Sequence, residues 1–190
     1  MERQRRTCAE TCLELLSIEL VHYYAAQNQA PLAASTEAIG FRVGRQLAER
    51  CTWDRPRLVE QLDVMKFICK EFWIELFQKQ VDNLRTNHRG TFVLKDSNFR
   101  WLSKLSVDLP PPIKGPPADT QGGAADKGTP RESNGALPTS PTASEAAQDY
   151  LHLPCAIIRG ALTHLGLPCT VSADASALPA CDFTINIRAS

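Results

Sequence analysis

The sequence predicts an α+β protein with one folded domain that a long polar insertion interrupts. Three helical stretches come first, a pair of strands follows, and a fourth helix and a second pair of strands close the chain. With 190 residues and 43% hydrophobic residues, the chain can form one domain with its own core. We therefore expect a single domain over residues 1–109 and 149–190, with residues 110–148 as a disordered insertion.

The first helix, expected over residues 4–27, is apolar on more than one side. Four large side chains share one face at the spacing of a helix: Leu13, Leu16, Leu20 and Tyr23. Leu15 and Ile18 lie off that face, and Glu10, Glu14 and Ser17 form only a narrow polar stripe. Such a helix needs cover on several sides. In a chain this short, we expect another protein to supply some of it.

The second helix is expected to begin at Ser35 or Thr36, since either side chain can cap a helix N-terminus. Its apolar side chains are Ile39, Phe41, Val43 and Leu47. Gly40 and Gly44 lie one turn apart inside it, where each costs about 1 kcal/mol relative to alanine. We expect them to form a flat groove that another helix approaches closely. The alternative is a loop that merely contains glycines.

The third helix is expected to follow Asp54 as its N-cap, with Pro56 in its first turn. A 4-3-4-3-4 stripe of apolar residues then predicts a continuous core helix: Leu58, Leu62, Met65, Cys69, Phe72 and Leu76. Asp63, Lys66 and Lys70 form its polar face.

Strands are expected on both sides of the insertion. Residues 84–94 predict two strands around a turn at Asn87 to Gly90. A fourth helix is expected to end at Gly166, and Pro154 leaves its first residue open. Residues 167–173 and 181–187 alternate as half-buried antiparallel strands. The insertion before this helix holds most of the 13 prolines and almost no large apolar residue, which predicts disorder.

The composition and the motifs argue against catalysis, a bound metal or a cofactor. Lys and Arg total 21, as do Asp and Glu, so no net charge favours nucleic acid or an acidic membrane. The histidines are dispersed, at positions 22, 88, 152 and 164, and no zinc-like or phosphate-binding spacing occurs. Seven cysteines in apolar patterns indicate reduced thiols. With no secretory signal or membrane span expected, we predict a cytoplasmic protein that is not an enzyme.

Four stretches carry a resemblance to a known family: IGFRVG at residues 39–44, LDVMKFICK at 62–70, FQKQVDNLRTNHRGTFVL at 77–94 and IRGAL at 158–162. With the closing LPACDFTINI they cover nearly all of the chain outside the insertion. The chain resembles the small core subunits of the trafficking protein particle (TRAPP) vesicle-tethering complex, specifically the subunit 6 type.

The resemblance implies helices on one side of an antiparallel sheet and a dimer face made by the first two helices. It implies a heterodimer with a paralogous core subunit, within a tether that acts between endoplasmic reticulum and cis-Golgi. The assembled tether promotes nucleotide exchange on a Rab-type GTPase. The expected partner interface contains ten residues: Leu13, Leu16, Leu20, Tyr23, Ile39, Gly40, Phe41, Val43, Gly44 and Leu47.

Two departures from the family pattern concern the insertion and lipid attachment. The insertion replaces a usually short connection. A related paralogue carries a fatty-acylated cysteine just before the third helix, where this chain has Arg55 and Pro56. The nearest thiol, Cys51, is offset from the position of that cysteine. We therefore expect no acylation. The alternative function is a domain that binds a lipid or another apolar small molecule in its core.

Overall fold

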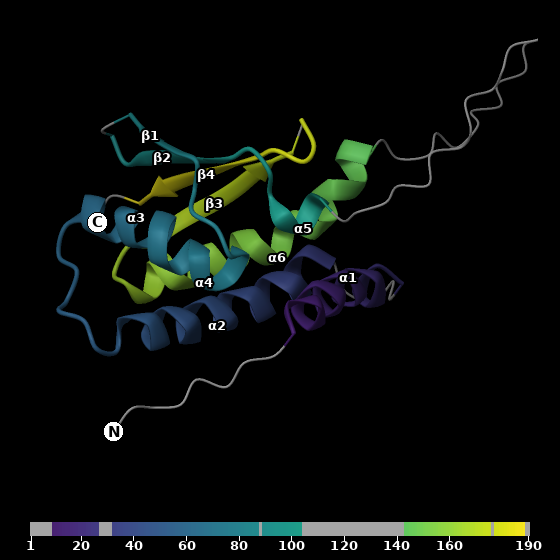
Figure 1. Cartoon of the computed structure of the whole chain (residues 1–190), viewed down its shortest axis with the longest axis horizontal. Helices are drawn as coiled ribbons and strands as arrows, with labels where there is room; N and C mark the ends of the chain where they lie inside the picture. The colour runs from purple at the N-terminus through teal and green to yellow at the C-terminus, as the bar shows by residue number, and fades with distance from the viewer. Residues whose placement is uncertain (1–8, 27–31, 88, 104–142, 176, 189–190) are drawn as a thin grey trace, which may run out of the picture.

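The computed structural model describes residues 9–26, 32–87, 89–103, 143–175 and 177–188. Its sheet has four antiparallel strands in the order β1–β2–β4–β3, and the helices lie on one face of it (Figure 1). The strands are β1 (Asn83–Thr86), β2 (Thr91–Asp96), β3 (Cys169–Asp174) and β4 (Cys181–Ile187). The predicted α+β class, with helices on one side of a small antiparallel sheet, is confirmed.

The two central strands supply the sheet's part of the core. In β2 and β4, the buried residues alternate with less buried ones, which is the pattern of strands with one covered face. The register pairs Phe92 with Ile185 and Leu94 with Phe183, so apolar side chains stand opposite each other on the helix side. The predicted turn between β1 and β2 is also present, with Gly90 at a φ of 91°.

The helices form layers beneath this sheet. They are α1 (Glu10–Ala26), α2 (Leu32–Thr52), α3 (Gln61–Phe67), the π-helical turn η1 (Ile68–Phe72), α4 (Trp73–Phe77), α5 (Arg100–Ser103) and α6 (Ala143–His164). The α6 helix lies between the sheet and α2, and α1 lies against both α2 and α6, away from the sheet (Figure 1).

The α2 and α6 helices approach each other through glycines. A Cβ atom on Gly40 would lie 2.7 Å from the Cβ of Ala156, and one on Gly44 would overlap the main chain of Ile157. On α6, a Cβ atom on Gly160 would overlap the carbonyl of Phe41. The close helix approach expected from Gly40 and Gly44 therefore exists, and it joins two helices of the same chain.

The predicted start of the third helix was wrong. The α2 helix continues to Thr52, residues 53–60 form a connection, and α3 begins after Glu60, whose side chain makes no capping hydrogen bond. Asp54 is therefore no helix cap. The residue before a proline is disfavoured in helical conformation, so Arg55 opposes a helix that would begin at Asp54.

The continuous core helix is instead interrupted by η1. The Trp73 N–H bonds the Ile68 carbonyl five residues earlier, which defines a π turn, and the Cys69 carbonyl accepts a hydrogen bond of 3.0 Å from Val81. Met65, Cys69, Phe72 and Leu76 are buried on either side of the turn, whereas Leu62 is exposed.

The predicted start of the second helix was also wrong, and the start of the fourth helix, which the sequence left open, lies well before Pro154. The α2 helix begins at Leu32, and the buried Thr36 hydroxyl donates to the Ala33 carbonyl at 3.2 Å instead of capping the helix. The α6 helix begins at Ala143, so residues 143–148 belong to it and not to the insertion. Ala147 is buried, and this contact stabilises the first turns of α6 although Pro154 lies inside the helix. The rest of the expected insertion, residues 110–142, lies outside the described residues.

Candidate functional site: the outer face of α1 and α2

The α1 helix presents mostly polar residues to the rest of the chain. Glu14, Ser17 and Val21 are buried, at the spacing of one helical face. The Ser17 hydroxyl donates to the Glu14 carbonyl at 2.8 Å, which satisfies the buried hydroxyl within the helix. Two residues of the predicted polar stripe, Glu14 and Ser17, therefore lie on the inner side of α1 beside Val21, whereas Leu13, Leu15 and Leu16 are exposed.

Polar contacts help to hold α1 in place. The Glu14 carboxylate forms an ion pair with Arg100 of α5, with 3.5 Å between Oε1 and Nε. Farther along α1, the His22 ring lies edge-on to Tyr150 of α6, and its Nε2 is 3.0 Å from the Tyr150 hydroxyl. These contacts fix which side of α1 faces the domain.

The opposite side of α1 exposes large apolar side chains. Leu15 and Leu16 are 62% and 63% exposed, and Tyr23 is 58% exposed. We call this surface the outer face and define it by five residues that are each more than a third exposed: Leu13, Leu15, Leu16 and Tyr23 of α1 and Val43 of α2. Fully burying one leucine side chain contributes about 1.5–3 kcal/mol. A second protein that covers this face would gain several such contributions.

The ten residues of the expected interface divide into two groups. Leu13, Leu16, Tyr23 and Val43 are exposed, and Phe41 is half-buried with the Arg159 guanidinium 5.1 Å from its ring centroid. The other five face the chain's own interior: Leu20, Ile39, Gly40, Gly44 and Leu47.

For the two glycines, the prediction of an intersubunit groove was wrong, because the carbonyls and side chains of α6 already fill the space beside them. Sequence reasoning also missed Leu15, which is among the most exposed leucines of the outer face. Its signal was present, since Leu15 is an apolar residue that lies off the face shared by Leu13 and Leu16.

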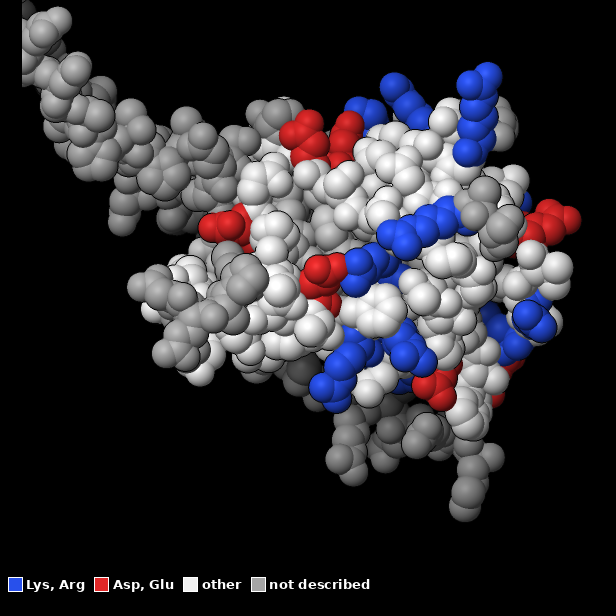
Figure 2. Space-filling model, turned by 180° about the vertical axis from the view of Figure 1, so that it is seen from behind, with Lys and Arg blue, Asp and Glu red and all other residues white. Residues whose placement is uncertain are grey.

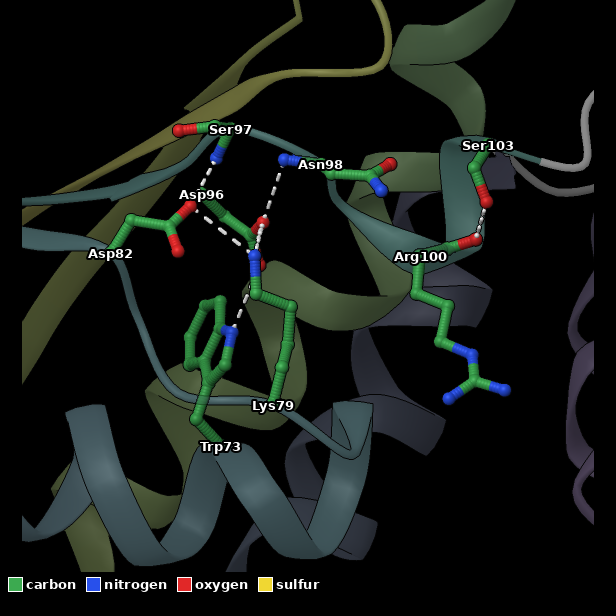
Figure 3. A network of polar contacts seen from close by, with 8 residues as sticks. All are labelled: Trp73, Lys79, Asp82, Asp96, Ser97, Asn98, Arg100 and Ser103. Carbon is green, nitrogen blue, oxygen red and sulfur yellow. Dashed lines mark hydrogen bonds and ion pairs between the residues drawn. The ribbon is translucent and has the colours of Figure 1, made fainter.

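A buried polar network connects the helices to the sheet (Figure 3). Asp96, at the end of β2, accepts hydrogen bonds from Trp73 Nε1 at 3.1 Å, Lys79 Nζ at 2.6 Å and the Asn98 amide at 3.1 Å. Lys79 also pairs with Asp82, which accepts a hydrogen bond from the Ser97 amide. These bonds tie Trp73 of α4 and Lys79 to Asp96 of β2, so we interpret the network as structural.

The electrostatics of the network follow from these bonds. The Ser97 amide, aided by Lys79, holds the pKa of Asp82 below its ordinary value although slight burial opposes the shift. Desolvation lowers the pKa of Lys79, but hydrogen bonds with Asp96 and Asp82 outweigh it and leave that pKa raised. Both shifts favour the charged forms, as expected for a stable ion-pair cluster.

The described part of the chain offers no reactive thiol site among its buried cysteines. Burial raises the pKa of the buried Cys69 and of the half-buried Cys155 to about 12 and that of Cys169 to about 11, so these thiols stay protonated and inert at neutral pH. Within the described residues, no group of three His, Cys, Asp or Glu side chains could hold a metal ion. Nor is any described helix long and apolar enough to span a bilayer.

Aromatic side chains fill the core where an apolar ligand was the alternative. Phe67, Ile68 and Trp73 are all buried, and the Trp73 ring lies 4.6 Å from Phe77 and 5.3 Å from Phe183, between ring centroids. Cavities of about 300 and 290 Å³ lie elsewhere, since none of these five residues lines them.

On the side opposite to Figure 1, basic and acidic side chains lie among one another (Figure 2).

The model of one protein family, described as transport protein particle (TRAPP) component, matches residues 13–188. The chain belongs to this family. Relatives include zebrafish (Danio rerio) trafficking protein particle complex subunit 6b, 35% identical over 184 residues that cover 94% of this chain and 97% of that protein. Mouse (Mus musculus) subunit 6B is 40% identical over 152 residues, or 80% of this chain and 76% of that protein.

Among solved structures, subunit 3 from Naegleria fowleri, covalently bound to palmitic acid, shares the fold. It has a TM-score of 0.61 at 14% sequence identity, and the match covers 95% of this chain and 98% of that one. Cattle (Bos taurus) subunit 6A is also related, at 34% identity over 182 residues, or 92% of this chain and 94% of that protein. Within the TRAPP family the chain is therefore of the subunit 6 type, a trafficking-complex subunit whose partners include other TRAPP subunits.

Proposed function

We propose that this TRAPP subunit is a non-catalytic structural component that binds a paralogous core subunit through the outer face of α1 and α2. The observation that carries the proposal is the orientation of α1, which turns Glu14 and Ser17 inward and Leu13, Leu15 and Leu16 outward. A surface helix that folds alone places its apolar stripe against its own core. The reversed arrangement favours a helix whose apolar side another protein covers.

The chemistry of the outer face fits a lasting interface more than a transient one. Leucine and tyrosine side chains supply large apolar area, and the described ion pairs Glu14–Arg100 and Glu37–Arg159 lie within the chain. Obligate interfaces are more apolar than transient ones. We therefore propose a heterodimer that forms early and persists in the assembled complex.

At the level of the cell, we propose that the assembled complex tethers vesicles in transport from endoplasmic reticulum to Golgi and supports nucleotide exchange on a Rab-type GTPase. The family membership supports this role, and the inert buried thiols are consistent with a subunit that contributes contacts and no chemistry. The chain would then reach the cis-Golgi as a peripheral member of the complex.

We further propose that this subunit carries no fatty acid, unlike the palmitic acid-bound subunit 3 of Naegleria fowleri. Its nearest thiol to the connection at residues 53–60 is Cys51, which lies within α2 and is half-buried. The intact mass of the chain purified from its own cells tests this directly, because an attached palmitoyl group would appear as an added mass that hydroxylamine removes.

Co-expression with a TRAPP core partner tests the docking surface. Leu16→Glu would place a charge in the centre of the interface without a counter-charge, and we expect it to weaken co-purification by about tenfold or more. The control is Leu178→Glu, because Leu178 is also an exposed leucine and lies on the connection between β3 and β4. This control should bind the partner as well as the wild type.

The outcome also separates an interface from a hidden core position. If circular dichroism shows that Leu16→Glu unfolds the chain, Leu16 belongs to the interior of the chain. If both variants bind the partner with equal strength, the outer face is not the docking surface and the proposal fails.

A further inference from the structure

The connection between α2 and α3 exposes apolar side chains far from the outer face. Trp53 is 74% exposed and Val59 is 85% exposed, and Leu62 in the first turn of α3 is 45% exposed. This connection leaves the C-terminal end of α2, whereas α1 lies along the other end of that helix (Figure 1). A second protein could therefore occupy it while the outer face is also covered.

A cavity of about 290 Å³ lies between the connection and the end of α6, and its lining includes Thr52 and Leu58, the sequence neighbours of Trp53 and Val59. The ionisable groups that line it are Arg55, Arg57 and His164, with no carboxylate among its lining residues. Arg55 is already engaged, because it pairs with Glu71 and lies 5.6 Å from the Phe67 ring centroid. Arg57 is exposed and takes part in none of the ion pairs between described residues.

The end of α6 does not oppose an anion here as strongly as a helix C-terminus usually would. The Thr163 carbonyl accepts a hydrogen bond of 3.1 Å from Gly166, and the Leu162 carbonyl accepts one of 2.9 Å from Leu167. Gly166, at a φ of 88°, makes this cap possible. Because these carbonyls are satisfied internally, the arginine side chains dominate the charge of the cavity.

We propose that the α2–α3 connection is a second docking surface, which binds an acidic, apolar segment of another protein. A carboxylate of that segment enters the cavity and pairs with Arg57, and its neighbouring apolar side chains cover Trp53 and Val59. Tryptophan and arginine are the residues most enriched at the energetic centre of protein interfaces. A guanidinium also binds a carboxylate through paired hydrogen bonds, which fixes the position of the segment.

The charge balance favours a protein over an anionic membrane as the occupant. Residues 49–62 contain three basic and three acidic side chains, so the segment has no net charge to attract a bilayer. Membrane attraction of this kind grows with the number of clustered basic residues. An arginine in a cavity with no ion pair to another described residue instead suits one carboxylate at a defined position.

The test is a selection of short random peptides, displayed on phage, against the full chain. We expect enrichment of Asp or Glu next to Leu, Ile or Phe. The strongest synthetic peptide is then titrated, by fluorescence anisotropy, against the wild type and single variants. Arg57→Gln and Trp53→Ser should each weaken its binding by about tenfold. Arg85→Gln, at an exposed arginine of β1, is the matched control and should leave binding unchanged.

Three results would overturn the inference. The selection enriches no acidic, apolar peptide, or the selected peptide binds Arg57→Gln and the wild type equally well. In the third result, binding of the selected peptide does not depend on Arg57, but binding of inorganic phosphate or of vesicles that contain phosphatidylserine does. Binding of phosphate would assign the cavity to a small anion, and binding of vesicles would assign it to a membrane. All variants carry an intact outer face, so partner binding through α1 gives an independent check that each one is folded.

Discussion

The contact between α2 and α6 and the contact between α1 and the rest of the domain rest on opposite chemistry. The first uses three glycines, Gly40, Gly44 and Gly160, to bring two helix backbones together. The second buries Val21 beside polar residues and includes the Glu14–Arg100 ion pair. Both regions were predicted as surfaces for a partner. The glycine contact is filled by the chain's own α6, whereas α1 leaves Leu15, Leu16 and Tyr23 exposed and so keeps the character of a docking element.

This difference teaches that a close-approach motif and an exposed apolar face are separate signals. A glycine groove requires some helix nearby, and here the chain's own α6 provides it. An apolar helix that turns polar residues inward has no such partner within the described chain. The following experiments should break or sharpen this contrast.

The largest effect is expected at the glycine contact. Gly44→Leu would force its side chain into the main chain of Ile157, and backbone cannot yield as a side chain does. We expect a loss of at least about 3 kcal/mol, the upper end for overpacking, and a fall in Tm of roughly 6–12 °C. Thermal unfolding followed by circular dichroism measures it. Ala38→Leu, at an exposed position of α2, is the control and should change Tm little. A Gly44→Leu variant with the same Tm as the wild type would show that α2 and α6 are not in contact.

A smaller loss is expected in the polar network between helix and sheet. Asp96→Asn removes the charge that binds Lys79, at a site that is fully buried. Hydrogen bonds to charged groups contribute about 1.5–3 kcal/mol, so we expect a loss of about 2 kcal/mol in urea unfolding. Asp63→Asn breaks the exposed pair with Lys66 and should cost less than about 0.5 kcal/mol. Equal effects of the two substitutions would mean that the network contributes no more than a surface pair.

The two sides of α1 should differ in the chain alone. Val21→Ser replaces a buried apolar side chain, and we expect it to lower the free energy of unfolding by about 1–2 kcal/mol. Leu16→Ser changes an exposed side chain, and its effect should stay within about 0.5 kcal/mol. Urea unfolding of the isolated chain measures both. If Leu16→Ser costs as much as Val21→Ser, then the chain itself covers the outer face.

The smallest effect concerns Asp82 and pH. In the folded chain the pKa of Asp82 lies below its ordinary value of 3.8. Between these two pKa values, the unfolded chain therefore binds more protons than the folded chain does. The stabilisation from Asp82 is therefore complete above pH 3.8 and disappears as pH falls through the lower folded pKa. Asp82→Asn should be less stable than the wild type at neutral pH and equal to it at the acid end of a titration between roughly pH 2 and pH 5. A difference that persists at the acid end would assign the effect to shape and not to charge.

The sequence sufficed for the class, the strands and the hairpin turn, because these depend on local alternation and on one glycine, Gly90. Helix boundaries failed where tertiary contacts outweighed local signals. Thr36 resembles a cap, but it lies buried inside α2, and Asp54 precedes Arg55 and Pro56 in a connection. The π turn at Cys69 has no sequence signal that we recognised, because its carbonyl bonds Val81 from beyond the helix.

The sequence could predict only part of the candidate site, because tertiary contacts also decide how α1 is oriented. Periodicity identifies which residues share a helical face, such as Leu13 and Leu16, but it does not say which face meets the domain. The polar contacts of Glu14 and His22 decide that orientation, and their partners, Arg100 and Tyr150, are far away in the sequence. For the same reason, Gly44 could not be assigned to α6 or to another chain before the fold was known.

Hydrogen exchange of the subunit, alone and in the assembled TRAPP complex, tests the docking role of α1 most directly. We predict that the backbone amides of α1 exchange at least about tenfold more slowly in the complex, because a partner covers the outer face and suppresses local opening. The amides of α6, already enclosed by the sheet and α2, should exchange equally in both states. Unchanged exchange in α1, with new protection on some other element, would contradict the account.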